Sequence, residues 1–124
     1  MTHAILVVDD SATVRQQLTS FLKNNGFEAT AAENGTDALQ QAQSRSKAFD
    51  MVVTDVNMPQ MGGLEMIAAL RLRPGYAKTP IFVLTTESTA DIMAKGKALG
   101  ATAWIVKPFK PEILLKGIHK VLGL

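Results

Sequence analysis

The chain contains no cysteine, one tryptophan, one tyrosine and two histidines. The absence of cysteine excludes disulfides, thiolate catalysis and cysteine-ligated zinc. No apolar run approaches the roughly 20 residues that a membrane-spanning helix needs. The first residues, 1–8, lack the basic region and the cleavage site of a signal peptide. The sequence therefore predicts a cytoplasmic protein with no membrane partner.

Charge is nearly balanced overall but unevenly distributed. Residues 1–65 carry eight acids and four bases, whereas residues 66–124 carry three acids and nine bases. The bases form no dense cluster with interleaved aromatic residues, so the sequence does not favour a nucleic-acid partner. We interpret the asymmetry as an acidic site in the first half and a basic surface or counter-charge in the second.

A length of 124 residues, with 47% hydrophobic and 19% charged residues, is typical of one folded domain. We expect this domain to span 1–124, without internal repeats or linkers. Because the last helix-like segment runs to the end of the sequence, we expect a stand-alone domain without an attached output domain. We also expect a monomer.

Strand-like and helix-like segments alternate along the whole sequence. The expected strands are short apolar runs, many of them without polar alternation, at 4–8, 27–32, 50–55, 80–84 and 101–106. Apolar stripes at helical spacing follow each run, with Ser11, Thr36 and Ser88 as the expected N-caps of three helices and Pro111 in the first turn of the last. Five such units predict an α/β fold: a parallel sheet of order 2-1-3-4-5, sandwiched by five helices in a flavodoxin-like arrangement.

The strand-like run 50–55 ends in Asp55, a charged residue that suits the rim of a sheet better than its core. In a parallel sheet every carboxyl end points to one rim, where such folds bind their ligands. Other strand ends also carry polar groups: Asp9 and Asp10 after the first, Thr85 after the fourth and Lys107 after the fifth. The sequence therefore predicts that these side chains converge on Asp55.

Three crowded carboxylates repel one another unless a cation lies among them. Oxygen donors without histidine or cysteine favour a hard ion, and Mg²⁺ fits best. With the metal bound, Asp55 can attack phosphorus as a nucleophile and form an aspartyl phosphate. The ammonium of Lys107 and the hydroxyl of Thr85 can contact the phosphoryl oxygens. Thr85 is preferred over the neighbouring hydroxyls of Thr86 and Ser88 only because it is in register with Lys107.

Four sequence motifs, taken together, resemble the motif set of response-regulator receiver domains. They are Val7-Val8-Asp9-Asp10-Ser11, Thr54-Asp55-Val56-Asn57-Met58-Pro59, Leu84-Thr85-Thr86-Glu87 and Val106-Lys107-Pro108-Phe109. Their order and spacing match, and the resemblance extends from Ile5 to Leu124. The chain is most similar to the single-domain CheY type. One departure is Gly62, where many relatives carry aspartate.

The resemblance implies a role for each matching position. Asp55 would accept the phosphoryl group from a histidine kinase, and the backbone carbonyl of Asn57 would join Asp9, Asp10 and Asp55 as a Mg²⁺ ligand. Thr85 and Trp104 would form the switch, although Trp104 is also compatible with ordinary packing. Asn57 and Glu87 would tune the lifetime of the phosphate. The peptide bond between Lys107 and Pro108 is cis in the family.

The resemblance also implies a response regulator that signals by binding an output protein through its fourth helix, fifth strand and fifth helix. We expect a role in chemotaxis with a flagellar motor switch protein as target, and a phosphatase as a further partner. A phosphorelay shuttle that passes phosphate to a histidine phosphotransfer protein is the alternative. We do not expect a turnover enzyme. Two rivals outside this class are an aspartyl-phosphate phosphohydrolase and a constitutive interaction module with a degenerate site.

Overall fold

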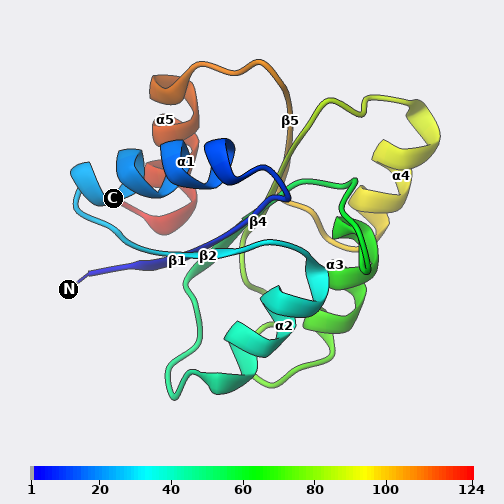
Figure 1. The fold of residues 1–124 in the computed structure, drawn as a ribbon, viewed down its shortest axis with the longest axis horizontal. Helices are drawn as coiled ribbons and strands as arrows, with labels where there is room; N and C mark the ends of the chain where they lie inside the picture. Colours follow the sequence, from blue (N-terminus) through cyan, green and yellow to red (C-terminus); the bar gives the residue numbers. More distant parts are fainter. Residues whose placement is uncertain (1) are drawn as a thin grey trace.

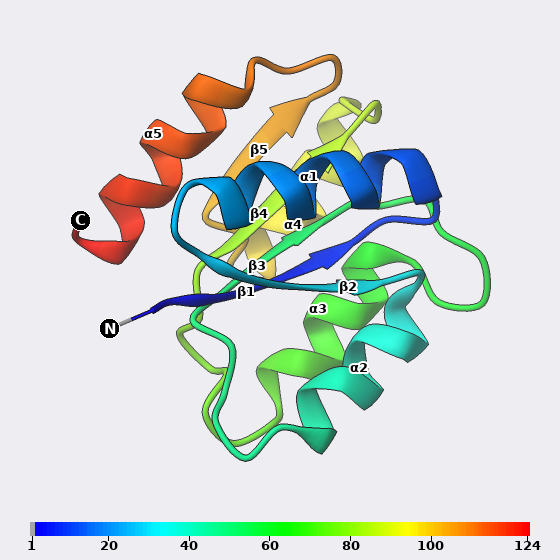
Figure 2. The ribbon, with the colours of Figure 1, turned by 60° about the vertical axis from the view of Figure 1, so that its left-hand side comes forward.

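The computed structural model describes residues 2–124 as a parallel sheet between two layers of helices (Figures 1 and 2). The strands are β1 (Ala4–Val8), β2 (Glu28–Ala32), β3 (Met51–Thr54), β4 (Ile81–Thr85) and β5 (Ala103–Val106). The helices are α1 (Ala12–Asn24), α2 (Gly35–Ser44), α3 (Gly63–Arg71), α4 (Ala90–Ala98) and α5 (Pro111–Leu122). The strand order is β2-β1-β3-β4-β5 and every pairing is parallel, which confirms the predicted fold class.

The burial of each strand follows its place in the sheet. Every residue of the central strands β1, β3 and β4 is buried, as their unbroken apolar runs predict. The edge strands β2 and β5 are partly exposed. Side chains from α1 and α5 complete the core on one face of the sheet, and side chains from α2 and α3 complete it on the other. Figure 2 shows α1 and α5 together on one side, with α2 and α3 on the opposite side.

Several local predictions need correction at the helix ends. Ser11 caps α1 as expected, since its hydroxyl accepts from the Val14 N–H at 3.3 Å. The N-cap of α2, however, is Asn34 rather than Thr36: the Asn34 side chain accepts from Asp37 N–H at 2.9 Å, and the helix begins earlier. The N-cap of α4 is Thr89, without a side-chain hydrogen bond, rather than Ser88. In both places neighbouring polar residues compete for one cap position.

Strand lengths also differ slightly from the predictions. Thr85 belongs to β4 instead of following it, while Asp50 and Asp55 flank β3 without being part of it. Gly62 is the N-cap of α3, and its backbone is extended there. The peptide bond between Lys107 and Pro108 is cis, as the resemblance implied. In the part of the chain that the structure describes, no helix is both long and apolar enough to span a membrane.

Candidate functional site

The site lies at the carboxyl ends of β1 and β3, which are neighbours in the sheet. The last pair in their register is Val8 with Thr54, so the next residues, Asp9 and Asp55, emerge side by side. The backbone continues to hold them there, because the Asp55 N–H donates to the Val8 carbonyl at 2.9 Å. Parallel pairing of two apolar strands therefore brings together carboxylates that are 46 residues apart in the sequence.

Three acids form a cluster at this rim. One carboxylate oxygen from each of Asp9, Asp10 and Asp55 lies within 4.8 Å of the others. Asp9 is buried, with 2% of its surface exposed, whereas Asp55 is partly buried and Asp10 is exposed. Burial weakens the screening of the charges by water, so their mutual repulsion costs more here than on an open surface. The cluster needs a cation.

Lys107 supplies part of that positive charge. Its ammonium lies 2.7 Å from Asp9 Oδ2 and 3.1 Å from Asp55 Oδ2, and it donates a hydrogen bond to each. Partial burial by itself lowers the pKa of Lys107, but the hydrogen bonds and the negative charges of Asp9 and Asp55 outweigh that effect and raise the pKa above its ordinary value. Lys107 is therefore charged at any physiological pH and links the ends of β1, β3 and β5.

The remaining charge suits a divalent cation. Three carboxylates and one ammonium leave two negative charges uncompensated, which is what one divalent ion neutralises. The donors are carboxylate oxygens, the ligands that Mg²⁺ and Ca²⁺ prefer. Asp10 makes no hydrogen bond or ion pair with any residue in 2–124 through its carboxylate, so its oxygens are available as ligands. The residues present thus fit the predicted metal.

The backbone around Asp55 fixes the direction of its carboxylate. Oδ1 accepts from the Val56 N–H at 2.6 Å, while Oδ2 faces Lys107 at the longer distance of 3.1 Å. The Gly63 N–H donates to the Val56 carbonyl at 2.8 Å and so folds the β3–α3 loop back onto the site. A β-carbon on Gly63 would overlap the Asp55 carbonyl oxygen. Glycine is required at 63 because α3 begins in contact with the backbone of Asp55.

The other side of the site is the loop after β4. Thr85 is completely buried, and its hydroxyl accepts from the Glu87 N–H at 3.2 Å. The Glu87 carboxylate accepts from Asn57 Nδ2 at 2.8 Å, which joins the β3–α3 and β4–α4 loops. The carbonyl of Glu87 accepts from the indole N–H of Trp104 at 2.8 Å. Asn57, Thr85, Glu87 and Trp104 thus form one connected network.

Two contacts of the site were not anticipated from the sequence. Arg15, on α1, donates from Nη1 to the Asp9 carbonyl at 2.7 Å, and the Ser11 N–H donates to Asp9 Oδ1 at 2.9 Å. Together they hold the first acid against the start of α1. Ser11 was recognised only as a helix cap. No local pattern reveals the contact of Arg15, because its partner is a backbone carbonyl six residues away.

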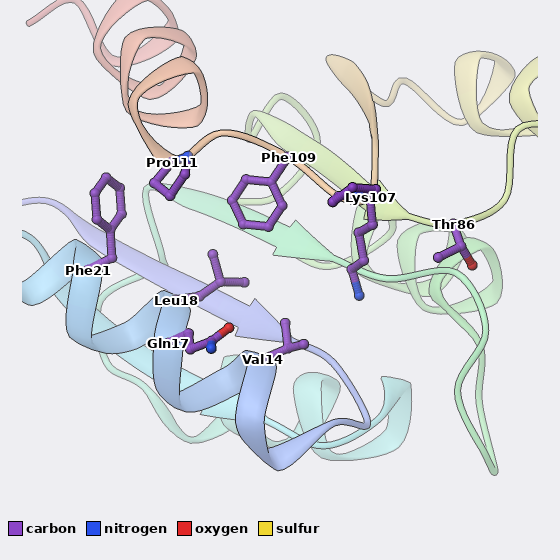
Figure 3. A pocket seen from close by; sticks show the side chains of 9 residues that line it. Val14, Gln17, Leu18, Phe21, Thr86, Lys107, Phe109 and Pro111 are labelled. Atoms are coloured by element: carbon purple, nitrogen blue, oxygen red, sulfur yellow. The ribbon is translucent and has the colours of Figure 1, made fainter.

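An apolar groove of about 640 Å³ adjoins the site (Figure 3). One wall is α1 and the other is the segment between β5 and α5 (Figure 3). Lys107, which contacts Asp9 and Asp55, also lines the groove. Its lining residues are Val14, Gln17, Leu18, Phe21, Thr86, Lys107, Pro108, Phe109 and Pro111. Apolar contact surface is thus continuous with the charged rim.

Comparison with known proteins agrees with this geometry. Residues 5–119 match the response regulator receiver domain family. The chain is 36% identical to the chemotaxis protein CheY of Pseudomonas aeruginosa over 118 residues, covering 94% of each chain. It is also 36% identical to CheY1 of Helicobacter pylori over 121 residues, covering 96% of each.

Solved structures give the same result for the fold. The chemotaxis protein CheY4 of Vibrio cholerae superimposes with a TM-score of 0.91 at 44% identity, covering 98% of this chain and 99% of the other. A CheY-like receiver domain protein from Methanospirillum hungatei superimposes with a TM-score of 0.89 at 27% identity, covering 99% and 95% of the two chains. The relatives named here are CheY or CheY-like proteins, and the chain belongs to the response regulator receiver domain family.

Proposed function

We propose that the protein accepts a phosphoryl group on Asp55 and transmits that event by binding another protein. The observation that carries this proposal is the contact of Lys107 with both Asp9 and Asp55, beside an Asp10 carboxylate that pairs with no other residue among those described, 2–124. This arrangement holds one carboxylate in a fixed direction and leaves two negative charges for a divalent cation. Ordinary structural ion pairs do not need a third, unpaired acid.

The metal of the proposal is Mg²⁺, held by Asp9, Asp10, Asp55 and the backbone carbonyl of Asn57. When bound, Mg²⁺ would neutralise charge on the transferring phosphoryl group. Asp55 itself provides the nucleophile. Because Oδ1 is engaged in the shorter hydrogen bond to the Val56 N–H, we assign the attack to Oδ2. Lys107, which already contacts Oδ2, can follow the oxygens of the incoming group without moving far.

The transfer step forms one bond and breaks one. Oδ2 of Asp55 bonds to phosphorus while the bond from phosphorus to the donor breaks. The electron pair of that bond leaves with the histidine imidazole of a kinase, or with acetate when acetyl phosphate is the donor. Histidine kinase is the proposed natural donor. The apolar groove between α1 and the β5–α5 segment adjoins Lys107 and offers the donor protein a contact surface.

The output of the proposal is a two-state change. The hydroxyl of Thr85, which now accepts from the Glu87 N–H, would turn to donate to the phosphoryl group, and Trp104 would respond through Glu87. The surface formed by α4, β5 and α5 would then bind the output protein. To move such an equilibrium from about 1:99 to 99:1, phosphorylation must favour the active state by ~5.5 kcal/mol.

Chemotaxis is the proposed setting, because the curated relatives at 36% identity are named as chemotaxis proteins. We propose a flagellar motor switch protein as target and a phosphatase as the partner that ends the signal. We do not propose a turnover enzyme, because the two adjacent acids follow β1 while the nucleophile follows β3. Phosphohydrolases that form an aspartyl phosphate instead carry an Asp-x-Asp pair on one strand.

The test is phosphoryl uptake from acetyl phosphate, followed by intact mass. The proposal expects a mass gain of one phosphoryl group that needs Mg²⁺, disappears with a chelator and is absent from Asp55→Asn. It also expects no sustained release of phosphate from a generic phosphomonoester. Sustained turnover of that substrate would support an enzyme instead. A pull-down that compares the phosphorylated chain with Asp55→Ala identifies the output partner.

A further inference from the structure

Trp104 is held on two sides. Its ring packs against the core on the α4 side of the sheet, where Leu64, Ile92 and Leu99 are among its partly buried companions. Its indole N–H donates to the Glu87 carbonyl at 2.8 Å, in the loop between β4 and α4. The ring is therefore docked between that loop and α4.

The residue of α4 beneath the ring is Gly96. Gly96 is the only buried residue of α4, although it has no side chain to bury. A β-carbon at this position would lie 2.5 Å from Cζ3 of Trp104 and 3.1 Å from its Cε3. Real β-carbons do not approach other heavy atoms that closely, so no other residue at 96 leaves this ring where it is.

Gly96 is an unfavourable choice for a helix interior in every other respect. Alanine would strengthen the helix, and Ala94 and Ala98 occupy exposed positions on the same helix. From the sequence alone, Gly96 appears only as a residue that weakens α4. The close approach of the indole explains why glycine occupies position 96 despite its low helix propensity.

Glu87 connects this contact between Gly96 and Trp104 to the phosphoryl site. Its N–H donates to the Thr85 hydroxyl, its carboxylate accepts from Asn57, and its carbonyl accepts from Trp104. One residue thus touches the switch hydroxyl, the loop after Asp55 and the aromatic ring. Two hydrogen bonds through Glu87 therefore connect the Thr85 hydroxyl to the indole.

We propose that Gly96 is a positioning residue that seats Trp104 against α4, so that the indole ties α4 to the β4–α4 loop. In this proposal, which rests on the proposed function, Trp104 acts as a strut that carries the displacement of Glu87 to α4. Glu87 binds the N–H of the five-membered ring of the indole, and Gly96 lies against its six-membered ring.

The seat is tested first on the unphosphorylated protein with Gly96→Ala. Because the chain has one tryptophan, the indole N–H gives a single, unambiguous NMR signal. We expect that signal to shift and the indole N–H to exchange with solvent about tenfold faster, as its hydrogen bond to Glu87 opens. The matched control is Ala98→Gly, which also changes glycine content in α4 but lies outside the contact with the ring; its indole signal should stay as in wild type. An unchanged indole signal in Gly96→Ala overturns the proposal.

A second variant covers the case in which Gly96→Ala does not fold. Gly96→Ala combined with Trp104→Phe removes the fused ring that carries Cζ3 and makes room for the new methyl group. The proposal expects this double variant to fold, with backbone NMR signals of α4 present. If the double variant also fails to fold, glycine is needed for another reason and the proposal is wrong.

The coupling is tested with beryllofluoride as a phosphoryl analogue in the presence of Mg²⁺. In Gly96→Ala, the NMR shift changes of α4 amides should fall to less than about half of the wild-type changes, while the amides next to Asp55 respond as in wild type. If the shift changes of the α4 amides in Gly96→Ala are as large as in wild type, Trp104 does not transmit the displacement to α4. If the amides next to Asp55 fail to respond in the wild type itself, and acetyl phosphate adds no mass, it is the proposed function that fails. The indole measurement on the unphosphorylated chain then still decides whether Gly96 forms the seat.

Discussion

Asn57 and Glu87 are hydrogen-bonded to each other, with Asn57 Nδ2 donating to Glu87 Oε1 at 2.8 Å. Asn57 follows Asp55 by two residues and Glu87 follows Thr85 by two, so the bond joins the two loops beside the phosphoryl site. The bond places a negative charge near the path of any anionic phosphodonor. Because the pair is exposed, we expect its effect to be kinetic more than structural.

The charge of Glu87 should slow phosphorylation by small anionic donors. Glu87→Gln removes the charge but keeps the oxygen that accepts from Asn57. A unit charge at roughly 8 Å in water contributes ~0.5 kcal/mol per charge of the donor, so we expect uptake from acetyl phosphate to be about two- to fivefold faster at low ionic strength. The advantage should shrink as salt is added.

The measurement is the rate of mass gain at two salt concentrations. Glu28→Gln is the control, because Glu28 begins β2 at the opposite end of the sheet. Its rate should match wild type. An unchanged rate in Glu87→Gln would mean that this carboxylate does not act on the donor electrostatically.

Repulsion among Asp9, Asp10 and Asp55 should lower the unfolding free energy of the metal-free protein relative to a variant with one carboxylate fewer. Asp10→Asn removes one of the three negative charges and leaves the contacts of Lys107 intact. Without Mg²⁺ we expect the free energy of unfolding to rise by roughly 0.5–1 kcal/mol. Mg²⁺ stabilises a protein only to the extent that it binds, and wild type keeps all three acids. Millimolar Mg²⁺ should therefore narrow or reverse the difference in unfolding free energy between Asp10→Asn and wild type.

Urea denaturation with and without Mg²⁺ checks this prediction. Asp91→Asn is the control, since Asp91 lies in the first turn of α4, where a negative charge is favourable. It should lower stability by a few tenths of a kcal/mol regardless of Mg²⁺. If Asp10→Asn behaves like Asp91→Asn, the acids do not repel one another as we argue.

Thr85 should be needed for the response to phosphorylation but not for phosphorylation itself. Its hydroxyl contacts the Glu87 N–H, and no hydrogen bond joins it to Asp55. We expect Thr85→Ala to gain the phosphoryl mass while losing the accompanying change in Trp104 fluorescence. Thr85→Ser keeps the hydroxyl and should retain most of that change.

Thr86→Ala is the matched control, because it removes the neighbouring hydroxyl, and Thr86 lines the groove between α1 and the β5–α5 segment. Fluorescence and intact mass are recorded on the same samples. The assignment of the switch to Thr85 is wrong if Thr86→Ala, and not Thr85→Ala, abolishes the fluorescence change.

Arg71 should matter for stability far from the phosphoryl site. Its guanidinium donates to four backbone carbonyls, those of Tyr76, Thr79, Leu99 and Gly100, at 2.7 to 3.3 Å. These bonds fasten the end of α3 to the segments that lead into β4 and β5. We expect Arg71→Ala to lower the free energy of unfolding by roughly 2–3 kcal/mol, because several carbonyls lose their donor together.

Arg73→Ala is the control, since in residues 2–124 the Arg73 side chain makes no ion pair or hydrogen bond. Its effect should stay within about 0.5 kcal/mol. Both variants are compared by urea denaturation. Equal effects of the two substitutions would show that the four contacts of Arg71 contribute little.

The sequence predicts the sheet well because the information is local. Unbroken apolar runs such as 4–8 and 81–84 are typical of strands buried on both faces of a sheet. Five strand-like segments with intervening helices leave few topologies. The site follows from the same logic, since polar residues at the ends of parallel strands converge. Asp9, Asp10, Asp55 and Lys107 were placed together for this reason and lie together in the structure.

Contacts that depend on the final packing could not be predicted in this way. Arg15 and Arg71 donate to backbone carbonyls, which every residue possesses, so no sequence pattern points to their partners. The requirement for Gly63 arises only when α3 begins against the Asp55 backbone. The cap of α2 was misplaced at Thr36 because Asn34, two residues earlier, competes successfully for the same helix end.

The central claim is that Asp55 accepts a phosphoryl group with the help of a divalent metal. The most direct measurement is intact mass and peptide mapping after incubation with acetyl phosphate, with Mg²⁺ or with a chelator. The account predicts one added phosphoryl group, located on the peptide that contains Asp55, only with Mg²⁺ and never in Asp55→Asn. No added mass in the wild-type chain, or equal addition in Asp55→Asn, would contradict it.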